Sequence, residues 1–83
     1  MRKVENKSVT DLYQYVFTKT FVKLMKKNKI SRRELARASG YSIDGIHKQI
    51  QKRRVYPRTI IALCKMMKCQ PKYITDLVDA EFE

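Results

Sequence analysis

The segment from Ser31 to Gln51 constrains the fold most, because the start of each of its helices and the turn between them can be predicted from residue types. Ser31 and Glu34 fit a capping box, in which each side chain bonds to the backbone amide of the other residue. Gly40 can adopt the positive φ that ends a helix tightly, and Ser42 can cap the next helix. Two short helices joined by a glycine-containing turn form a helix-turn-helix. We therefore predict this motif over residues 31–51.

Two further positions suit the packing of such a motif. Ala36 is small where the two helices would cross closely, and Ile46 would fill the angle between them. With Gly40 they give the spacing Ala-x3-Gly-x5-Ile. We take Ala36, Gly40 and Ile46 as the scaffold of the motif.

Hydrophobic periodicity predicts three more helices and no sheet. A long helix that starts near Ser8 and ends near Asn28 carries apolar residues at three- and four-residue steps: Leu12, Val16, Phe17, Phe21, Leu24 and Met25. After the second short helix, 43–51, a basic loop at 52–56 leads to Pro57, which cannot continue that helix. Two later helices are marked by Ile60, Ile61, Leu63, Cys64 and Met67, and by Pro71, Tyr73, Ile74, Leu77 and Val78. The expected fold class is all-α, with five helices and a central helix-turn-helix.

The length of the chain predicts a single domain. Eighty-three residues leave room for one core, and 43% hydrophobic content is enough to pack it. We expect a folded domain at 8–79, a flexible basic arm at 1–7 and an acidic tail at 80–83. So small a domain has little room for a deep substrate pocket, and no nucleophile–base pairing or glycine-rich phosphate loop is present. We therefore expect no enzyme, no cofactor and no small-molecule ligand.

Net charge is the strongest compositional feature. Nineteen Lys and Arg against eight Asp and Glu give +11, a density typical of proteins that meet a polyanion. From Lys19 to Lys72 there are 16 basic residues and two acidic ones, whereas from Tyr73 onward there are four acidic residues and no basic ones. We expect the acidic end to face away from any nucleic acid.

The two cysteines, Cys64 and Cys69, predict neither a disulfide nor a metal site. Five residues apart on one helix, they would point about 140° apart with alpha carbons roughly 8 Å apart, beyond disulfide reach. We expect reduced core thiols in a cytoplasmic protein. With His47, the one histidine, they lack the paired spacing of zinc sites. The start of the chain lacks the apolar region of a signal peptide, and no stretch approaches the roughly 20 apolar residues of a transmembrane helix.

The sequence from about Phe21 to Ile74 carries a set of residues that is similar to a known family. The set comprises Ile30 to Ala36, Gly40-Tyr41-Ser42, Ile46, Pro57-Arg58, Leu63, Met67 and Tyr73-Ile74. On these residues the chain resembles the Cro and phage-repressor-type (XRE-like) family of DNA-binding domains. The resemblance implies that the third helix, 42–51, enters the major groove of double-stranded DNA. It also implies that Arg32 touches phosphate and can reach a base or brace the recognition helix.

A helical wheel gives the same orientation for the third helix. At 100° per residue, Ile43 and Ile50 share the apolar side of Ile46, and the remaining side chains form an outer polar face. The residues expected to contact base edges are Ile43, Asp44, His47, Lys48, Gln51 and Arg32. Lys48 can donate to guanine O6 or N7, and Asp44 can accept from cytosine N4. Ile43 lies at the border, where it can pack in the core or touch a thymine methyl.

Phosphate contacts are expected from the helix caps and from the arginines that flank the recognition helix. Helix N-termini and guanidinium groups both bind phosphate, and they supply salt-dependent affinity without sequence information. The residues are Ser31, Ser42, Arg53, Arg54 and Arg58.

Several positions depart from the family's pattern. Ser39 and Gln49 stand where members usually have apolar residues, and Met25 and Ile50 replace a pair of an arginine and an acid. Replacing both members of an ion pair by apolar groups is often neutral or stabilising, so this exchange is compatible with the fold. Gln49 instead suggests a recognition helix rolled toward Ile50. Asp44 is repelled by phosphate unless a cytosine pairs with it.

Three function classes remain open. The first is a sequence-specific regulator of transcription, a repressor or Cro-like switch protein acting at the nucleoid of a bacterial or phage-infected cell. Such a protein can form a homodimer on paired half-sites. The second is a phage-type modulator or antirepressor that binds a partner repressor through the same scaffold. The third treats 17–29 as a membrane-surface helix, and it is disfavoured because the same apolar stripe is needed for the core.

Overall fold

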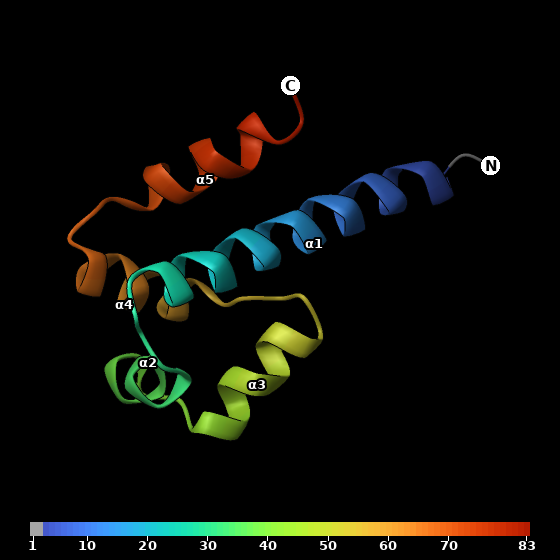
Figure 1. Cartoon of the computed structure of the whole chain (residues 1–83). Helices are drawn as coiled ribbons and strands as arrows, with labels where there is room; N and C mark the ends of the chain where they lie inside the picture. The colour runs from blue at the N-terminus through green and yellow to red at the C-terminus, as the bar shows by residue number, and fades with distance from the viewer. Residues whose placement is uncertain (1–2) are drawn as a thin grey trace.

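The protein is an all-α domain in a computed structural model that describes the backbone of residues 3–83 and the side chains of residues 9–83. This part of the chain contains five helices and no strand: α1 Lys3–Lys27, α2 Arg32–Ser39, α3 Ile43–Gln51, α4 Pro57–Met67 and α5 Pro71–Ala80. The long α1 runs between α5 on one side and the group of α2, α3 and α4 on the other (Figure 1). The predicted fold class and the helix-turn-helix over residues 31–51 are confirmed.

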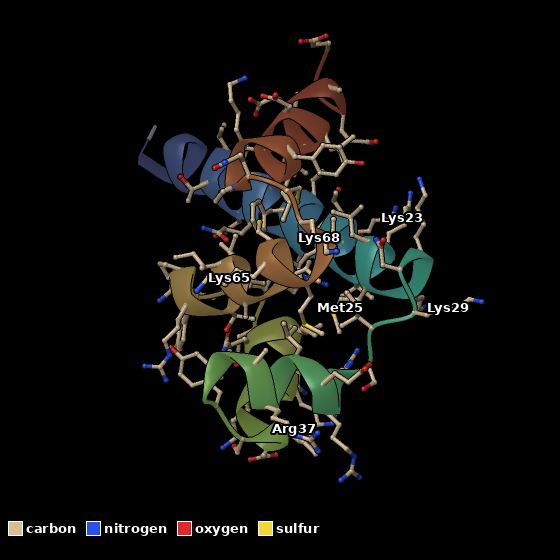
Figure 2. The ribbon with its side chains drawn as sticks, turned by 90° about the vertical axis from the view of Figure 1, so that its left-hand side faces the viewer. Lys23, Met25, Lys29, Arg37, Lys65 and Lys68 are labelled. Atoms are coloured by element: carbon tan, nitrogen blue, oxygen red, sulfur yellow. The ribbon has the colours of Figure 1, made fainter. Side chains whose placement is uncertain are left out.

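The core lies where α1 meets the other four helices. Its buried apolar side chains are Phe17, Phe21, Leu24, Met25, Leu35, Ala36, Ile46, Ala62, Leu63, Cys64, Ile74 and Val78. Met25 points into this core, whereas Lys23, Lys29, Arg37, Lys65 and Lys68 point outward (Figure 2). The apolar stripe of α1 is therefore buried in the core. The membrane-surface alternative requires this stripe to be exposed.

Two expectations about α1 are wrong. The helix begins at Lys3, five residues before Ser8, so residues 3–7 are helical; Met1 and Arg2 lie outside the described residues. Residues 3–7 contain neither glycine nor proline, so nothing in their sequence breaks a helix. Leu12, predicted in the core, is 51% exposed, because the buried stripe runs through Tyr13 and Phe17 and a neighbouring residue is rotated about 100° away.

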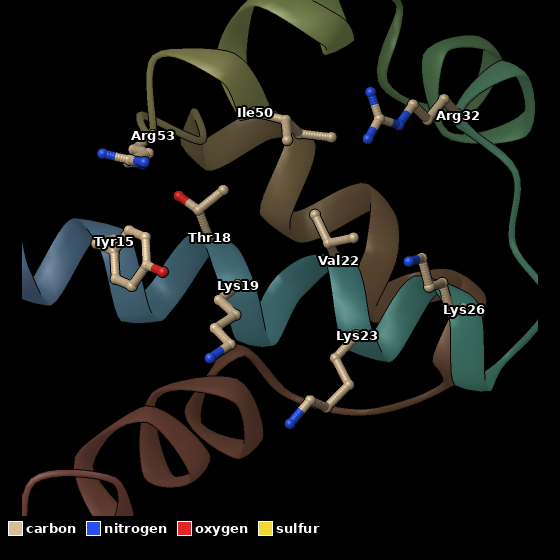
Figure 3. Close-up of a pocket in the computed structure, with 9 residues that line it drawn as sticks. All are labelled: Tyr15, Thr18, Lys19, Val22, Lys23, Lys26, Arg32, Ile50 and Arg53. Carbon is tan, nitrogen blue, oxygen red and sulfur yellow. The ribbon is translucent and has the colours of Figure 1, made fainter.

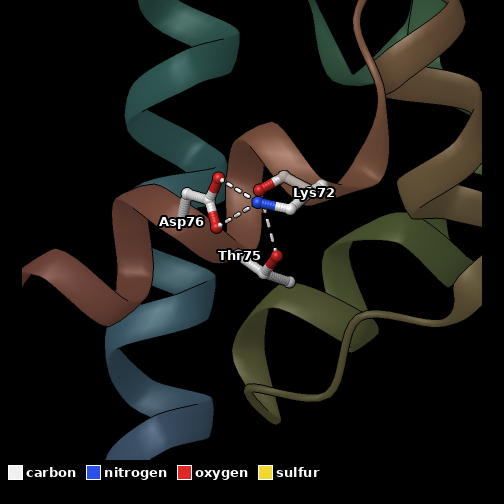
Figure 4. Close-up of polar contacts among 3 residues, drawn as sticks. All are labelled: Lys72, Thr75 and Asp76. Carbon is white, nitrogen blue, oxygen red and sulfur yellow. Dashed lines mark hydrogen bonds and ion pairs between the residues drawn. The ribbon is translucent and has the colours of Figure 1, made fainter.

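The acidic end of the chain lies on α5, which is separated from α3 by α1 (Figure 1). At its start Lys72 Nζ bonds to Asp76 Oδ2 at 3.0 Å, and Thr75 Oγ1 donates to the Lys72 carbonyl at 3.0 Å (Figure 4). The last basic side chain of the sequence is therefore paired within α5. Among side chains 9–83, the basic residues other than Lys72 all lie on the other helices and loops.

The expectation that both cysteines lie on one helix is also wrong. α4 ends at Met67, and Lys68 adopts a left-handed conformation with φ 58° and ψ 46°, so Cys69 lies beyond the helix. The Cys69 amide donates to the Cys64 carbonyl at 3.0 Å. Both are free thiols, Cys64 buried and Cys69 partly buried.

We expect the two thiols to differ in reactivity. Burial, and then the charge and hydrogen bond of Cys69, raise the pKa of Cys64 to about 11. The thiolate is the reactive form, and Cys64 is only 3% exposed. At pH 8, iodoacetamide should therefore modify Cys69 at least tenfold faster than Cys64, as measured by peptide mass spectrometry of the native chain.

The pH dependence and a control follow from the same pKa. Because folding raises the pKa of Cys64, the neutral thiol stabilises the fold fully below about pH 9, and this contribution is lost as the pH rises toward about 11. The rate ratio should narrow over the same range, and it should approach one in urea. Equal rates at pH 8 in the folded protein would contradict the assigned burial.

Candidate nucleic-acid interface

The start of α2 is fixed by the predicted capping box. The Glu34 amide donates to Ser31 Oγ at 3.0 Å, and the Ser31 amide donates to Glu34 Oε1 at 2.8 Å. These two hydrogen bonds, that from the Ser31 backbone first, hold the pKa of Glu34 below its usual range. The capping box therefore fixes the direction in which α2 starts, and with it the position of Arg32, the first residue of this helix.

The turn between α2 and α3 is held from two sides. Gly40 has φ 85°, and its amide donates to the Ala36 carbonyl at 2.9 Å. From α4, Arg58 Nε donates to the Ser39 carbonyl at 2.8 Å, and the Arg58 guanidinium lies 4.3 Å from the centre of the Tyr41 ring. Arg58, expected at a phosphate, thus braces the turn with one nitrogen while remaining exposed.

Ser39 is a polar residue at a buried position, and its hydroxyl is satisfied locally. Its Oγ donates to the Ala36 carbonyl at 3.3 Å and accepts from the Tyr41 amide at 3.4 Å. A buried hydroxyl costs free energy only when it lacks such partners. The departure from an apolar residue at this position therefore leaves the motif intact.

α3 is oriented differently from the expected roll toward Ile50. Ile46 is fully buried, and Gln49 is 5% exposed on the same side, whereas Ile43 and Ile50 are only partly buried at the two flanks. Gln49 is accepted in the core because its Oε1 receives two hydrogen bonds, from the Tyr56 amide at 3.0 Å and from Thr59 Oγ1 at 2.8 Å. Within the described side chains, its Nε2 has no partner.

The outer face of α3 carries the four predicted polar residues. Asp44, His47, Lys48 and Gln51 are all exposed. Lys48 Nζ lies 3.5 Å from Asp44 Oδ2, so the acid on this face has a positive neighbour. An exposed pair of this kind contributes only about 0.2–1 kcal/mol, and either partner is free to exchange it for a base edge.

Arg32 joins this face from α2. Its Nη1 lies 2.7 Å from Nδ1 of His47. A guanidinium can only donate, so His47 accepts through Nδ1. The ring proton then lies on Nε2, the nitrogen that is not bonded to Arg32. The structure thus brings Arg32 and His47 together, and these two residues link the start of α2 to the middle of α3.

The predicted phosphate-binding residues fall into two groups. The hydroxyls of Ser31 and Ser42 accept from the amides of Glu34 and Gly45, each at 3.0 Å, so they act as caps at the N-terminal ends of α2 and α3. Arg53 and Arg54 are exposed in the loop after α3. Arg53 has φ 56°, and its guanidinium lies 4.6 Å from the centre of the Tyr15 ring on α1.

A groove of about 520 Å³ between α1 and α3 was not predicted from the sequence. Arg32, Ile50 and Arg53 line it together with residues of α1 (Figure 3). The signal that could have found it is the spacing of Lys19, Lys23 and Lys26, which places three ammonium groups along one side of α1.

The geometry defines a class of protein: an all-α domain that presents a doubly capped helix-turn-helix with an exposed polar face on its second helix. Comparison with protein families agrees, since the profile of the Cro/C1-type HTH DNA-binding domain matches residues 21–82. The chain belongs to this family of DNA-binding domains. No curated protein and no solved structure gives a significant match.

The described part of the chain, residues 3–83, lacks two features. None of the helices in this part of the chain has the length and apolar character needed to cross a membrane. Over the same residues, no group of three or more His, Cys, Asp or Glu side chains could hold a metal ion.

Proposed function

We propose that the protein is a sequence-specific regulator of transcription, a repressor or Cro-like switch protein, that places α3 in the major groove of double-stranded DNA. The observation that carries this proposal is the exposed face of α3, where Asp44, His47, Lys48 and Gln51 stand beside Arg32. An α-helix fits the major groove, and these side chains supply both donors and acceptors for base edges. Partly buried Ile43 adds an apolar edge that suits a thymine methyl.

The phosphate contacts that we propose surround this face. The capped N-terminal ends of α2 and α3 offer backbone amides near Ser31 and Ser42, and Arg53 and Arg54 extend from the loop that follows α3. Arg58 supports the turn through Nε and keeps its other nitrogens for phosphate. A homodimer on paired half-sites, at the nucleoid of a bacterial or phage-infected cell, is the arrangement expected of such a regulator.

A second candidate is a phage-type modulator that binds a partner repressor through the same scaffold. The ion pair of Asp44 and Lys48 favours it, because these are the two charged residues of α3 at neutral pH and they cancel. The charges of α3 itself therefore add little attraction toward a polyanion, which leaves this helix open to a partner protein. This candidate predicts a stable complex with a repressor chain on size exclusion and no enriched DNA site.

Random-site selection on a duplex library tests the first candidate. Lys48→Ala should change the selected motif at one position, because it removes a donor to a base edge, with a loss of about 1–3 kcal/mol at that base pair. Arg53→Ala should weaken binding to all sequences alike. Lys65→Ala is the matched control, since it removes one exposed charge from α4, outside the helix-turn-helix. The absence of any selected motif at moderate salt would refute sequence-specific binding.

A further inference from the structure

The groove between α1 and α3 has a composition that the recognition of DNA does not require. Val22 and Ile50, both partly buried, face each other across it, and the Tyr15 ring borders it (Figure 3). Arg53 and Arg32 stand at its two ends, and Lys19, Lys23 and Lys26 line its edge along α1, where the Lys19 and Lys23 side chains turn away from α3. The groove is therefore an apolar floor framed by cations.

The charge of this groove is one-sided. Five of its lining residues are cationic and none is acidic. Among side chains 9–83, the ion pairs are those of Lys48 with Asp44 and Lys72 with Asp76, and neither involves a lining residue. A concave surface with one sign of charge concentrates the opposite sign. The occupant that fits it is an anion.

The apolar floor of the groove and the spacing of its lysines indicate which kind of anion fits it. A phosphate backbone has no apolar surface to cover Val22, Ile50 and the Tyr15 ring, whereas an amphipathic helix does. Lys19, Lys23 and Lys26 follow the steps i, i+4 and i+7, so a facing helix with acids at the same steps would meet all three. From Tyr15 to Lys26 the wall runs about 16 Å at 1.5 Å per residue, the length of about three helical turns.

We propose that this groove binds an acidic amphipathic helix of another protein. A consequence, which rests on the proposed function, is that such a helix displaces DNA, because Arg32 and Arg53 belong to both surfaces. The groove would then make the regulator responsive to a partner protein without any change in its recognition helix.

The test uses a synthetic helical peptide of four turns, with glutamates at i, i+4 and i+7 and leucines beside them, and measures its binding to the full chain by fluorescence anisotropy. A peptide with serines in place of the leucines keeps the charge and should bind at least tenfold more weakly. Lys19→Gln with Lys23→Gln should weaken binding of the leucine peptide at least fivefold. Lys65→Gln with Lys68→Gln removes the same charge from exposed positions on α4 and its C-terminal cap, and should change it less than twofold.

Several outcomes would overturn the proposal. Equal binding of the two peptides would show attraction by charge alone, and equal loss in the two lysine variants would place the site elsewhere. If the variant of Lys19 and Lys23 lost duplex binding and kept peptide binding, the groove would be a DNA surface. Displacement is measured separately, with the selected duplex: if no duplex binds, the proposed function fails, and the groove is still judged by the peptide titrations.

Discussion

Raising the monovalent salt concentration from 50 to 200 mM is expected to weaken duplex binding by about a hundredfold. The reason is counterion release: log K falls with log salt with a slope of about −0.9 for each phosphate neutralised, and we expect about four. The contacts assigned to phosphate are Arg53 and Arg54, the remaining nitrogens of Arg58, and the cationic start of α2 at Arg32. The measurement is a titration of one selected duplex at four salt concentrations.

Single variants show how much each residue contributes to the slope of log K against log salt. Arg53→Ala should reduce the slope by about one, whereas Lys65→Ala should leave it unchanged. Lys48→Ala should lower the affinity for the selected site while the slope for an unrelated duplex stays the same. A slope near zero, or one that Lys65→Ala lowers as much as Arg53→Ala does, would show that the helix-turn-helix does not position the phosphate contacts.

The net charge of +11 does not by itself decide between the two candidate functions. It raises the encounter rate with any polyanion, and an acidic protein is also one. What distinguishes them is what the exposed face of α3 meets: base edges in the proposed regulator, and a repressor chain in the proposed modulator. In the proposed regulator, the flanking arginines would supply the affinity, and α3, where the charges of Asp44 and Lys48 cancel, would supply the specificity.

The features that could be predicted from the sequence are those with local causes. The capping box at Ser31 and the turn at Gly40 depend on residues within four positions of each other, so the residue types alone indicate them. The exposed face of α3 follows from helical geometry once its start at Ser42 is known. The same local logic correctly placed Pro71 in the first turn of α5, and it predicted that α3 cannot continue through Pro57, which is the first residue of α4.

The features that could not be predicted depend on partners farther along the chain or on backbone conformations that the residue type does not favour. Arg58 bonds to the Ser39 carbonyl from 19 residues away. Lys68 ends α4 in a left-handed conformation usually taken by glycine, so the position of Cys69 was missed. The groove needs α1, α2 and the end of α3 to be packed before its lining exists.

Gln49→Ala is expected to lower the free energy of unfolding by about 3 kcal/mol. The substitution leaves a cavity at a site that is 5% exposed, and it removes the acceptor of the Tyr56 amide and of the Thr59 hydroxyl. The loss should appear as a fall in Tm of more than about 10 °C, since about 1 kcal/mol corresponds to roughly 4–8 °C in a domain of this size. Thermal unfolding followed by circular dichroism measures it.

A double-mutant cycle separates the hydrogen bond from the packing. Gln49→Leu fills the space and removes the unpaired Nε2, but it leaves the Thr59 hydroxyl and the Tyr56 amide without their acceptor, so it should cost about 1–2 kcal/mol. Adding Thr59→Val removes that orphaned hydroxyl, and it should recover the part of the loss that comes from this hydrogen bond, while the Tyr56 amide stays without its acceptor. Additive losses in the double variant would show that Gln49 does not join α3 to the start of α4 through Thr59. Recovery of this part of the loss would instead show that Gln49 is held to Thr59 by a hydrogen bond that an apolar pair can replace. A polar residue would then join α3 to α4 at a position where members of the family usually have an apolar one.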